Sequence, residues 1–144
     1  MAIWKQHADL ATLNAWSEHT LMQTLGIRIT ELGADYLRGT LPVDERTRQP
    51  YGILHGGASV ALAETLGSTA AMLCCEDGRA ALGLDINANH LRAVRDGLVT
   101  GTARPLHVGR ATQVWEIRIE NAAGQLTCIS RLTMAVVAAT SVGR

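Results

Sequence analysis

The chain has 144 residues and a mass of 15.4 kDa, which predicts a single domain and argues against a two-domain enzyme. Hydrophobic residues make up 47% and charged residues 18%, so a packed core is expected and a disordered chain is not. The 13 basic residues balance 13 acidic ones. Without net charge the chain has no field that would attract nucleic acid or an anionic membrane, and neither is expected as a partner.

The three cysteines, Cys74, Cys75 and Cys128, are odd in number and lack C-x-x-C spacing. They predict neither a disulfide framework nor a zinc site, and no metal site is expected elsewhere in the sequence. Residues 1–9 become polar before an apolar segment can form, so no secretory signal is expected. We therefore expect a protein of the reducing cytoplasm.

The first half of the chain predicts short helices, a hairpin and a long helix. Apolar residues at helical spacing over residues 9–25, ending at Gly26, predict one or two short helices. Residues 27–29 and 37–43 then alternate in the manner of a β-hairpin. Residues from 57 to about 73 are small or aliphatic on nearly every side, which indicates a central helix surrounded by protein rather than a membrane span.

The second half predicts four consecutive strands. The first has an apolar face that we expect to be its inner one, made of Leu82, Leu84, Ile86 and Ala88. Turn signals separate strands at residues 98–107, around 115–119 and at 126–137, and residues 138–144 are expected to be a frayed tail. This order predicts an α+β fold, with an antiparallel sheet wrapped around one long central helix in a single domain over residues 1–144.

Glu64 is the only formally charged residue between Arg48 and Glu76, and it lies in the middle of the predicted buried helix. Burying an ionised carboxylate costs free energy unless something compensates. One interpretation is structural, with Glu64 facing a solvent channel or paired with a distant arginine. The other is a catalytic carboxylate, which is favoured by Ser68 one helical turn further along the same face.

The segment that leads into this helix favours the catalytic interpretation. Gly56 and Gly57 leave backbone N–H groups unshielded at the positive end of the helix dipole, where an oxyanion could bind. His55 adds a hydrogen-bonding group at the same place. A flexible start to the helix and a structural histidine are the plainer alternatives.

Helix geometry separates these groups within one chain. Gly56 and Glu64 are eight residues apart, about 12 Å along a helix, so they cannot flank one carbonyl carbon together. If two copies of the helix pack antiparallel across a two-fold axis, Glu64 of one copy meets His55 and Gly56 of the other. Such a dimer would have two composite sites.

The sequence closely resembles the hotdog-fold acyl-CoA thioesterases in residues 49–50, 54–59 and 62–68. The likeness extends to further segments, so it covers nearly the whole chain: residues 3–5, 41–44, 87–90 and 105–107. Within the family it is most similar to the branch that contains 1,4-dihydroxy-2-naphthoyl-CoA thioesterase and the proofreading thioesterase of enterobactin synthesis.

The resemblance implies hydrolysis of an aryl- or medium-chain acyl-CoA by a homodimer that assembles into a homotetramer. Coenzyme A is then part of the substrate, and no separate cofactor is expected. Glu64 would be the nucleophile or the general base, and the Gly56 N–H would polarise the thioester carbonyl. Gln49 and His55 would hold substrate or water, and Ser68 would assist near Glu64. An acyl or aryl carrier protein is the alternative source of the thioester.

A neutral protein needs local cations to hold the phosphates of coenzyme A. We expect His90 and Arg92, at a strand end, and Gly109 and Arg110, in a turn, to supply these contacts. The alternative for each arginine is an ordinary solvated surface position.

Three other classes of function are weaker. Residues 57–61, Gly-Ala-Ser-Val-Ala, differ from the G-x-S-x-G turn of serine hydrolases only at the last position, but 144 residues are too few for the sheet which that turn requires. A dehydratase on the same fold would need a longer histidine motif than His55 provides. A non-catalytic acyl-CoA-binding module has no use for a buried glutamate.

Overall fold

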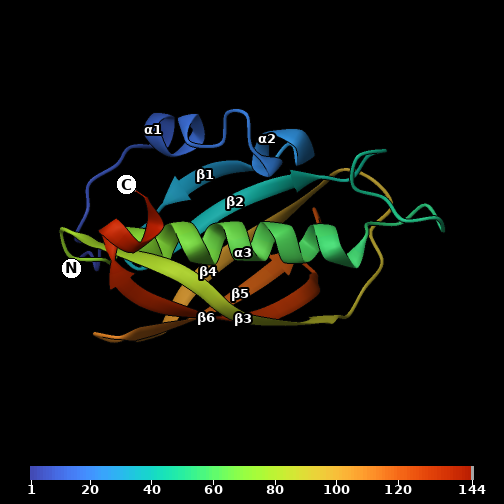
Figure 1. Cartoon of the computed structure of the whole chain (residues 1–144). Coiled ribbons are helices and arrows are strands. Elements are labelled where there is room, and N and C mark those ends of the chain that lie inside the picture. Colours follow the sequence, from blue (N-terminus) through green and yellow to red (C-terminus); the bar gives the residue numbers. More distant parts are fainter. Residues whose placement is uncertain (144) are drawn as a thin grey trace.

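The computed structural model describes residues 1–143, and it contains the helices and strands that the sequence predicts together with one 3-10 helix that it does not (Figure 1). In chain order they are α1 (Leu10–Ala15), α2 (Leu21–Leu25), β1 (Arg28–Leu32), β2 (Leu37–Pro42), α3 (Gly56–Leu73), β3 (Arg79–His90), β4 (Leu98–Val108), β5 (Thr112–Glu120), β6 (Leu126–Ala138) and the 3-10 helix η1 (Ala139–Val142). Gly26 ends α2 in the left-handed conformation, as its position after the apolar pattern suggested.

The strands form one six-stranded antiparallel sheet in the order β1-β2-β4-β5-β6-β3. Figure 1 shows the sheet curving around α3, with α1 and α2 beyond one edge of it. The inner side chains of the strands meet the buried side of α3 in a mostly aliphatic core, which contains among others Leu37, Leu41, Leu62, Leu66, Val99, Ile117, Ile119 and Leu132. The predicted α+β arrangement is confirmed.

Glycines in two central strands allow α3 to lie close to the sheet. The δ-methyl groups of Leu66 occupy the space that side chains at Gly39 and Gly101 would fill, since Cβ atoms built there would lie 2.8 and 2.7 Å from them. Gly67, on the helix itself, leaves similar room for Leu132. The position of α3 is therefore fixed by a close fit in which added methyl groups have no space.

The two edges of the sheet differ. At β1, the side-chain amide of Asn14 bonds the backbone of Ile29 twice, accepting from its N–H and donating to its carbonyl oxygen, each at 2.9 Å. At β3, 12 residues long, the edge away from β6 has no strand partner within residues 1–143. A long free edge strand readily pairs with another chain.

The prediction that the apolar face of β3 points inward is wrong for the first half of the strand. Leu82 and Leu84 are 45% and 63% exposed, whereas Ile86 and Ala88 are half-buried against the core. The register against β6 shifts between Gly83 and Asp85, so the strand contains a bulge. One extra residue at the bulge reverses which side chains point inward. Leu82 and Leu84 therefore do not lie on the same face as Ile86 and Ala88.

The chain end was expected to be a frayed tail over residues 138–144, and it differs from this over residues 138–143, whereas residue 144 lies outside the described residues. Strand β6 continues to Ala138, and Ala139–Val142 form η1, which the hydrogen bond from Ala139 N–H to the Gly78 carbonyl anchors at 2.8 Å. Backbone pairing with the turn before β3 explains this order. Within residues 1–143 no helix has the length and apolar character needed to cross a membrane.

The close packing of α3 against the sheet predicts how much stability is lost when residues at this contact are replaced. Leu66→Ala should lower the free energy of unfolding by about 2 to 5 kcal/mol because it leaves a cavity, and Gly101→Ala by about 1 to 3 kcal/mol because its methyl group overpacks the same place. Leu98→Ala, at a half-exposed position of β4, should change it by about 0.5 kcal/mol or less. Urea denaturation followed by circular dichroism measures all three, and equal effects would contradict the close fit.

Candidate active site

Glu64 lies in the middle of α3, on a side that the sheet reaches only with its edge strand β3. It is half-buried, and within residues 1–143 its carboxylate has no hydrogen-bond or ion-pair partner. The carboxylate rests against the backbone of β3, where a Cβ built on Gly83 would lie 2.9 Å from Glu64 Oε1. Gly83 was missed by the sequence reasoning, although a glycine inside a strand is itself a signal that another group approaches closely.

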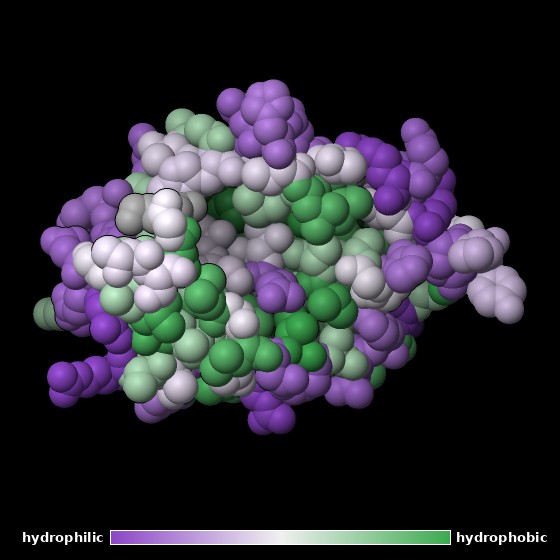
Figure 2. All heavy atoms as spheres, viewed as in Figure 1, coloured by the Kyte–Doolittle hydropathy of each residue, from purple (hydrophilic) through white to green (hydrophobic). Residues whose placement is uncertain are grey.

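Glu64 and Ser68 lie on the wall of a cavity of about 620 Å³ between α3, β3 and the α1–α2 segment. Figure 2 shows this face hollowed near its centre, with apolar residues around the hollow. Most of the lining is apolar or small: Trp16, Leu21, Met22, Ala61, Met72, Ala80, Ala81, Leu82 and Val142. This size is in the range of ordinary small-molecule sites. The expectation that protein surrounds α3 on all sides therefore fails for the single chain.

The N-terminus of α3 carries a backbone N–H that has no acceptor in the part of the chain that the structure describes. His55 is the N-cap, and its Nδ1 accepts from the Gly57 N–H at 2.7 Å. In the neutral ring the proton then lies on Nε2, which is free to donate. The N–H of Gly56 has no acceptor within residues 1–143. This end of the helix therefore offers an imidazole N–H and a backbone N–H at the positive end of the dipole.

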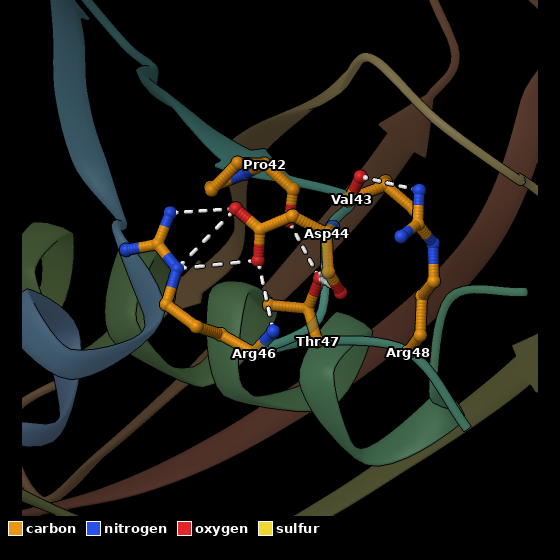
Figure 3. Close-up of polar contacts among 6 residues, drawn as sticks. All are labelled: Pro42, Val43, Asp44, Arg46, Thr47 and Arg48. Atoms are coloured by element: carbon orange, nitrogen blue, oxygen red, sulfur yellow. Dashed lines mark hydrogen bonds and ion pairs between the residues drawn. The ribbon is translucent and has the colours of Figure 1, made fainter. Parts of the chain in front are cut away.

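A polar loop before α3 holds this helix start in place (Figure 3). The Thr47 hydroxyl donates to the Pro42 carbonyl at 2.7 Å, and the Thr47 carbonyl accepts from the His55 N–H at 2.8 Å. Arg46 pairs with Asp44 at 2.7 Å, and this guanidinium lowers the pKa of the Asp44 carboxyl. The loop thereby connects the end of β2 to the residue that caps α3.

Gln49 follows this loop and is half-buried. Its backbone N–H donates to the Ile53 carbonyl at 2.8 Å, and its side-chain Oε1 accepts from the Tyr51 N–H. The side-chain oxygen is thus occupied, whereas the amide Nε2 is left with its N–H donors. The structure therefore places Gln49 in the loop just before the end of α3 that carries His55 and Gly56.

The four residues expected to hold coenzyme A divide into two groups within one chain. A Cβ built on Gly56 would lie 2.8 Å from His90 Nε2, so His90 lies against the start of α3, with the exposed Arg92 just beyond it. Gly109 and Arg110 lie in the β4–β5 turn at the opposite end of the sheet. On β6, His90 pairs with Cys128, whereas Ala111 in that turn bonds Val136, eight residues or roughly 25 Å further along the strand.

The residues expected to do chemistry are also separated within one chain. Gly56 and Glu64 lie on one continuous helix, α3, and are separated by about 12 Å along its axis. Ser68 lies beyond Glu64, further from the helix start. One chain therefore holds the carboxylate and the free backbone donor in two separate places.

The cysteines and Ser59 are poorly placed as nucleophiles. All three cysteines are free and buried, and burial raises the pKa of Cys74 to about 11. Ser59 is 4% exposed inside the first turns of α3, and the sheet is antiparallel throughout. A serine-hydrolase turn needs a preceding strand in a larger α/β sheet, so that hypothesis is contradicted.

Comparison with known proteins identifies the family. The model of the thioesterase superfamily matches residues 51–128, which include α3, β3 and the helix start with its free donor. The chain belongs to the thioesterase superfamily. It is 51% identical over 134 residues to 1,4-dihydroxy-2-naphthoyl-CoA hydrolase of Escherichia coli K12, a match that covers 93% of this chain and 98% of that one. It is 54% identical over 134 residues to the proofreading thioesterase EntH of Cronobacter turicensis, with the same two coverages.

A solved structure agrees with these relatives. The chain superposes on the crystal structure of thioesterase HI1161 from Haemophilus influenzae with a TM-score of 0.93 and 51% identity, covering 94% of this chain and 95% of that one. The fold is therefore the hotdog fold, and this thioesterase is a thioester hydrolase, as the resemblance in the sequence led us to expect.

Proposed function

We propose that this thioesterase hydrolyses aryl- or medium-chain acyl-CoA to the free acid and coenzyme A, with Glu64 as its catalytic carboxylate. The observation that supports this most strongly is an unpaired carboxylate on the wall of a largely apolar cavity. Such a cavity suits an acyl group, and the carboxylate lies where the reacting carbonyl would be. The names of the E. coli and Cronobacter relatives support the same reaction type.

The complete site would form between two chains. Antiparallel packing of two α3 helices brings Glu64 of one protomer to Gln49, His55 and Gly56 of its partner. Within one chain, by contrast, Gly56 is about 12 Å from Glu64 along the helix. Two features of the single chain support this packing. Among the described residues no strand pairs with the outer edge of β3, and the uncovered side of α3 carries mostly small side chains. We infer a homodimer, which then assembles into a homotetramer.

The same packing would unite the residues proposed to hold coenzyme A. Two β3 edges that run antiparallel bring opposite ends of the two sheets together. Gly109 and Arg110 of one protomer then approach His90 and Arg92 of the other. Within a single chain these two pairs lie at opposite ends of the sheet. Such a cluster supplies the local cations that phosphates require on a chain without net charge.

The chemistry follows from the groups so assembled. Addition to the thioester carbonyl places negative charge on its oxygen, and the Gly56 N–H and His55 Nε2–H donate to that oxyanion. In one route Glu64 accepts a proton from water as the hydroxide adds, and collapse of the intermediate breaks the C–S bond and releases the thiolate. In the other, Glu64 attacks, the thiolate leaves, and water hydrolyses the resulting anhydride. Gln49 and Ser68 would hold the water or the substrate.

Coenzyme A and carrier proteins present their acyl groups on the same pantetheine arm. The site proposed here would accept that arm from either source, so hydrolysis of acyl groups on an acyl or aryl carrier protein is the alternative. No metal ion or further cofactor enters either route.

Substitution of the carboxylate tests the assignment of Glu64. Glu64→Gln keeps the size of the side chain and removes its charge, so kcat/KM for acyl-CoA should fall by about 10² to 10⁴-fold with the fold unchanged. Ser59→Ala is the control and should retain nearly full activity. Release of free thiol, measured with a chromogenic disulfide, follows both. An inactive Ser59→Ala enzyme beside an active Glu64→Gln enzyme would overturn the assignment.

The composite site predicts complementation between two inactive variants. Glu64→Ala and His55→Ala should each be inactive alone, because every site of either homodimer has one lesion. In a mixed dimer both lesions fall in one site and the other site is intact. Turnover should therefore return after the two variants are unfolded together and refolded, and each variant refolded alone is the control. Mixed dimers that are visible by native mass spectrometry but inactive would show that both groups act within one chain.

A further inference from the structure

We propose that Val142, in the 3-10 helix η1 at the end of the chain, forms the far wall of the acyl cavity and limits the length of the acyl group. The inference rests on the function proposed above, and it assigns a specificity-determining role to a segment for which the sequence predicted no structure.

The cavity has a direction along α3. Its helix-side lining runs from Ala61 past Glu64 to Met72, and the last two are eight residues or about 12 Å apart along the axis. In the shared site proposed above, the oxyanion donors come from the start of the partner's α3, which meets this helix at Glu64. A carbonyl group held at Glu64 therefore has the cavity ahead of it, toward Met72. There the helix contributes Thr65, Ser68 and Thr69, and β3 contributes Ala80–Leu82.

Helix η1 stands at the Met72 end. Ala138 pairs with Arg79, and the Ala139 N–H bonds the Gly78 carbonyl at 2.8 Å, so η1 is anchored where β3 begins. Figure 1 shows η1 beside the C-terminal half of α3. The first residues of β3, Ala80–Leu82, line the same cavity as Val142.

Neighbouring residues of η1 differ in what they face. Val142 is half-buried and lines the cavity, whereas Ser141 is exposed and does not. A short acyl group at Glu64 would not reach Val142, but a long one would contact it. Substitutions at Val142 should therefore change kcat/KM for long acyl groups alone. In an apolar pocket, one methylene group more or less changes the ratio of kcat/KM between two substrates by about tenfold or more.

The test compares kcat/KM for butanoyl-, octanoyl- and dodecanoyl-CoA in the full-length protein. Val142→Trp should fill the far end of the cavity, and Val142→Asp should place a carboxylate where a long chain would otherwise bury its methyl end. Each should lower the ratio of dodecanoyl to butanoyl kcat/KM by about tenfold and leave butanoyl turnover nearly unchanged. Val142→Ala should raise the ratio.

Ser141→Trp and Ser141→Asp are the matched controls, because they introduce the same side chains on the exposed side of η1. A shift in the ratio at Val142 that is absent at Ser141 supports the proposal. It is overturned if the ratio stays constant in the Val142→Trp and Val142→Asp enzymes, or shifts equally in the Ser141 variants. Failure of the function itself would look different, because the unaltered enzyme would then hydrolyse neither these three thioesters nor benzoyl-CoA.

Discussion

One rigid helix carries the two groups that we propose for catalysis, and it keeps them apart. The free N–H of Gly56 and the unpaired carboxylate of Glu64 are separated by about 12 Å of α3. No side-chain rotation closes this gap, because the backbone N–H is fixed by the helix. The proposed site therefore requires a second copy of the helix, and the rest of the fold serves to present this one with its outer side uncovered.

The sheet leaves this side of α3 uncovered. It curves around α3 on one side only, and the glycines opposite Leu66 allow the helix to settle deeply into the curve. Asn14 covers the edge at β1, whereas the edge at β3 has no strand partner in the part of the chain that the structure describes. The uncovered side of α3 and the free edge of β3 are adjacent, since Glu64 lies against Gly83. A single interface with a second copy would therefore cover both the exposed side of α3 and the edge of β3.

Much of this architecture could be predicted from the sequence, because hydrophobic periodicity reports local structure directly. The small and aliphatic residues of 57–73 indicated the central helix, and a lone charge among them indicated Glu64. The bulge in β3 could not be predicted, because alternation on either side of it looks continuous until the register against β6 is known. Helix η1 was missed for a similar reason, since its anchor is the Gly78 carbonyl, 61 residues earlier in the chain.

The separation of the CoA-binding candidates was also invisible in the sequence. His90 and Arg110 are both plausible cations near strand ends, but only the sheet topology shows that these are opposite ends. Distances of this kind depend on strand order, which periodicity does not encode. They also turn a list of candidates into a geometric argument, because His90 and Arg110 are separated by roughly 25 Å of the sheet within one chain.

The most direct measurement is a crystal structure of the enzyme with a non-hydrolysable ketone analogue of an acyl-CoA. We expect the ketone oxygen to lie about 2.7 to 3.1 Å from the Gly56 nitrogen of one protomer, with the Glu64 carboxylate of the other protomer facing the carbonyl carbon. The acyl group should lie in the cavity beside that Glu64. A ketone contacted by Glu64 and Gly56 of the same chain, or bound away from Glu64 altogether, would contradict the shared site.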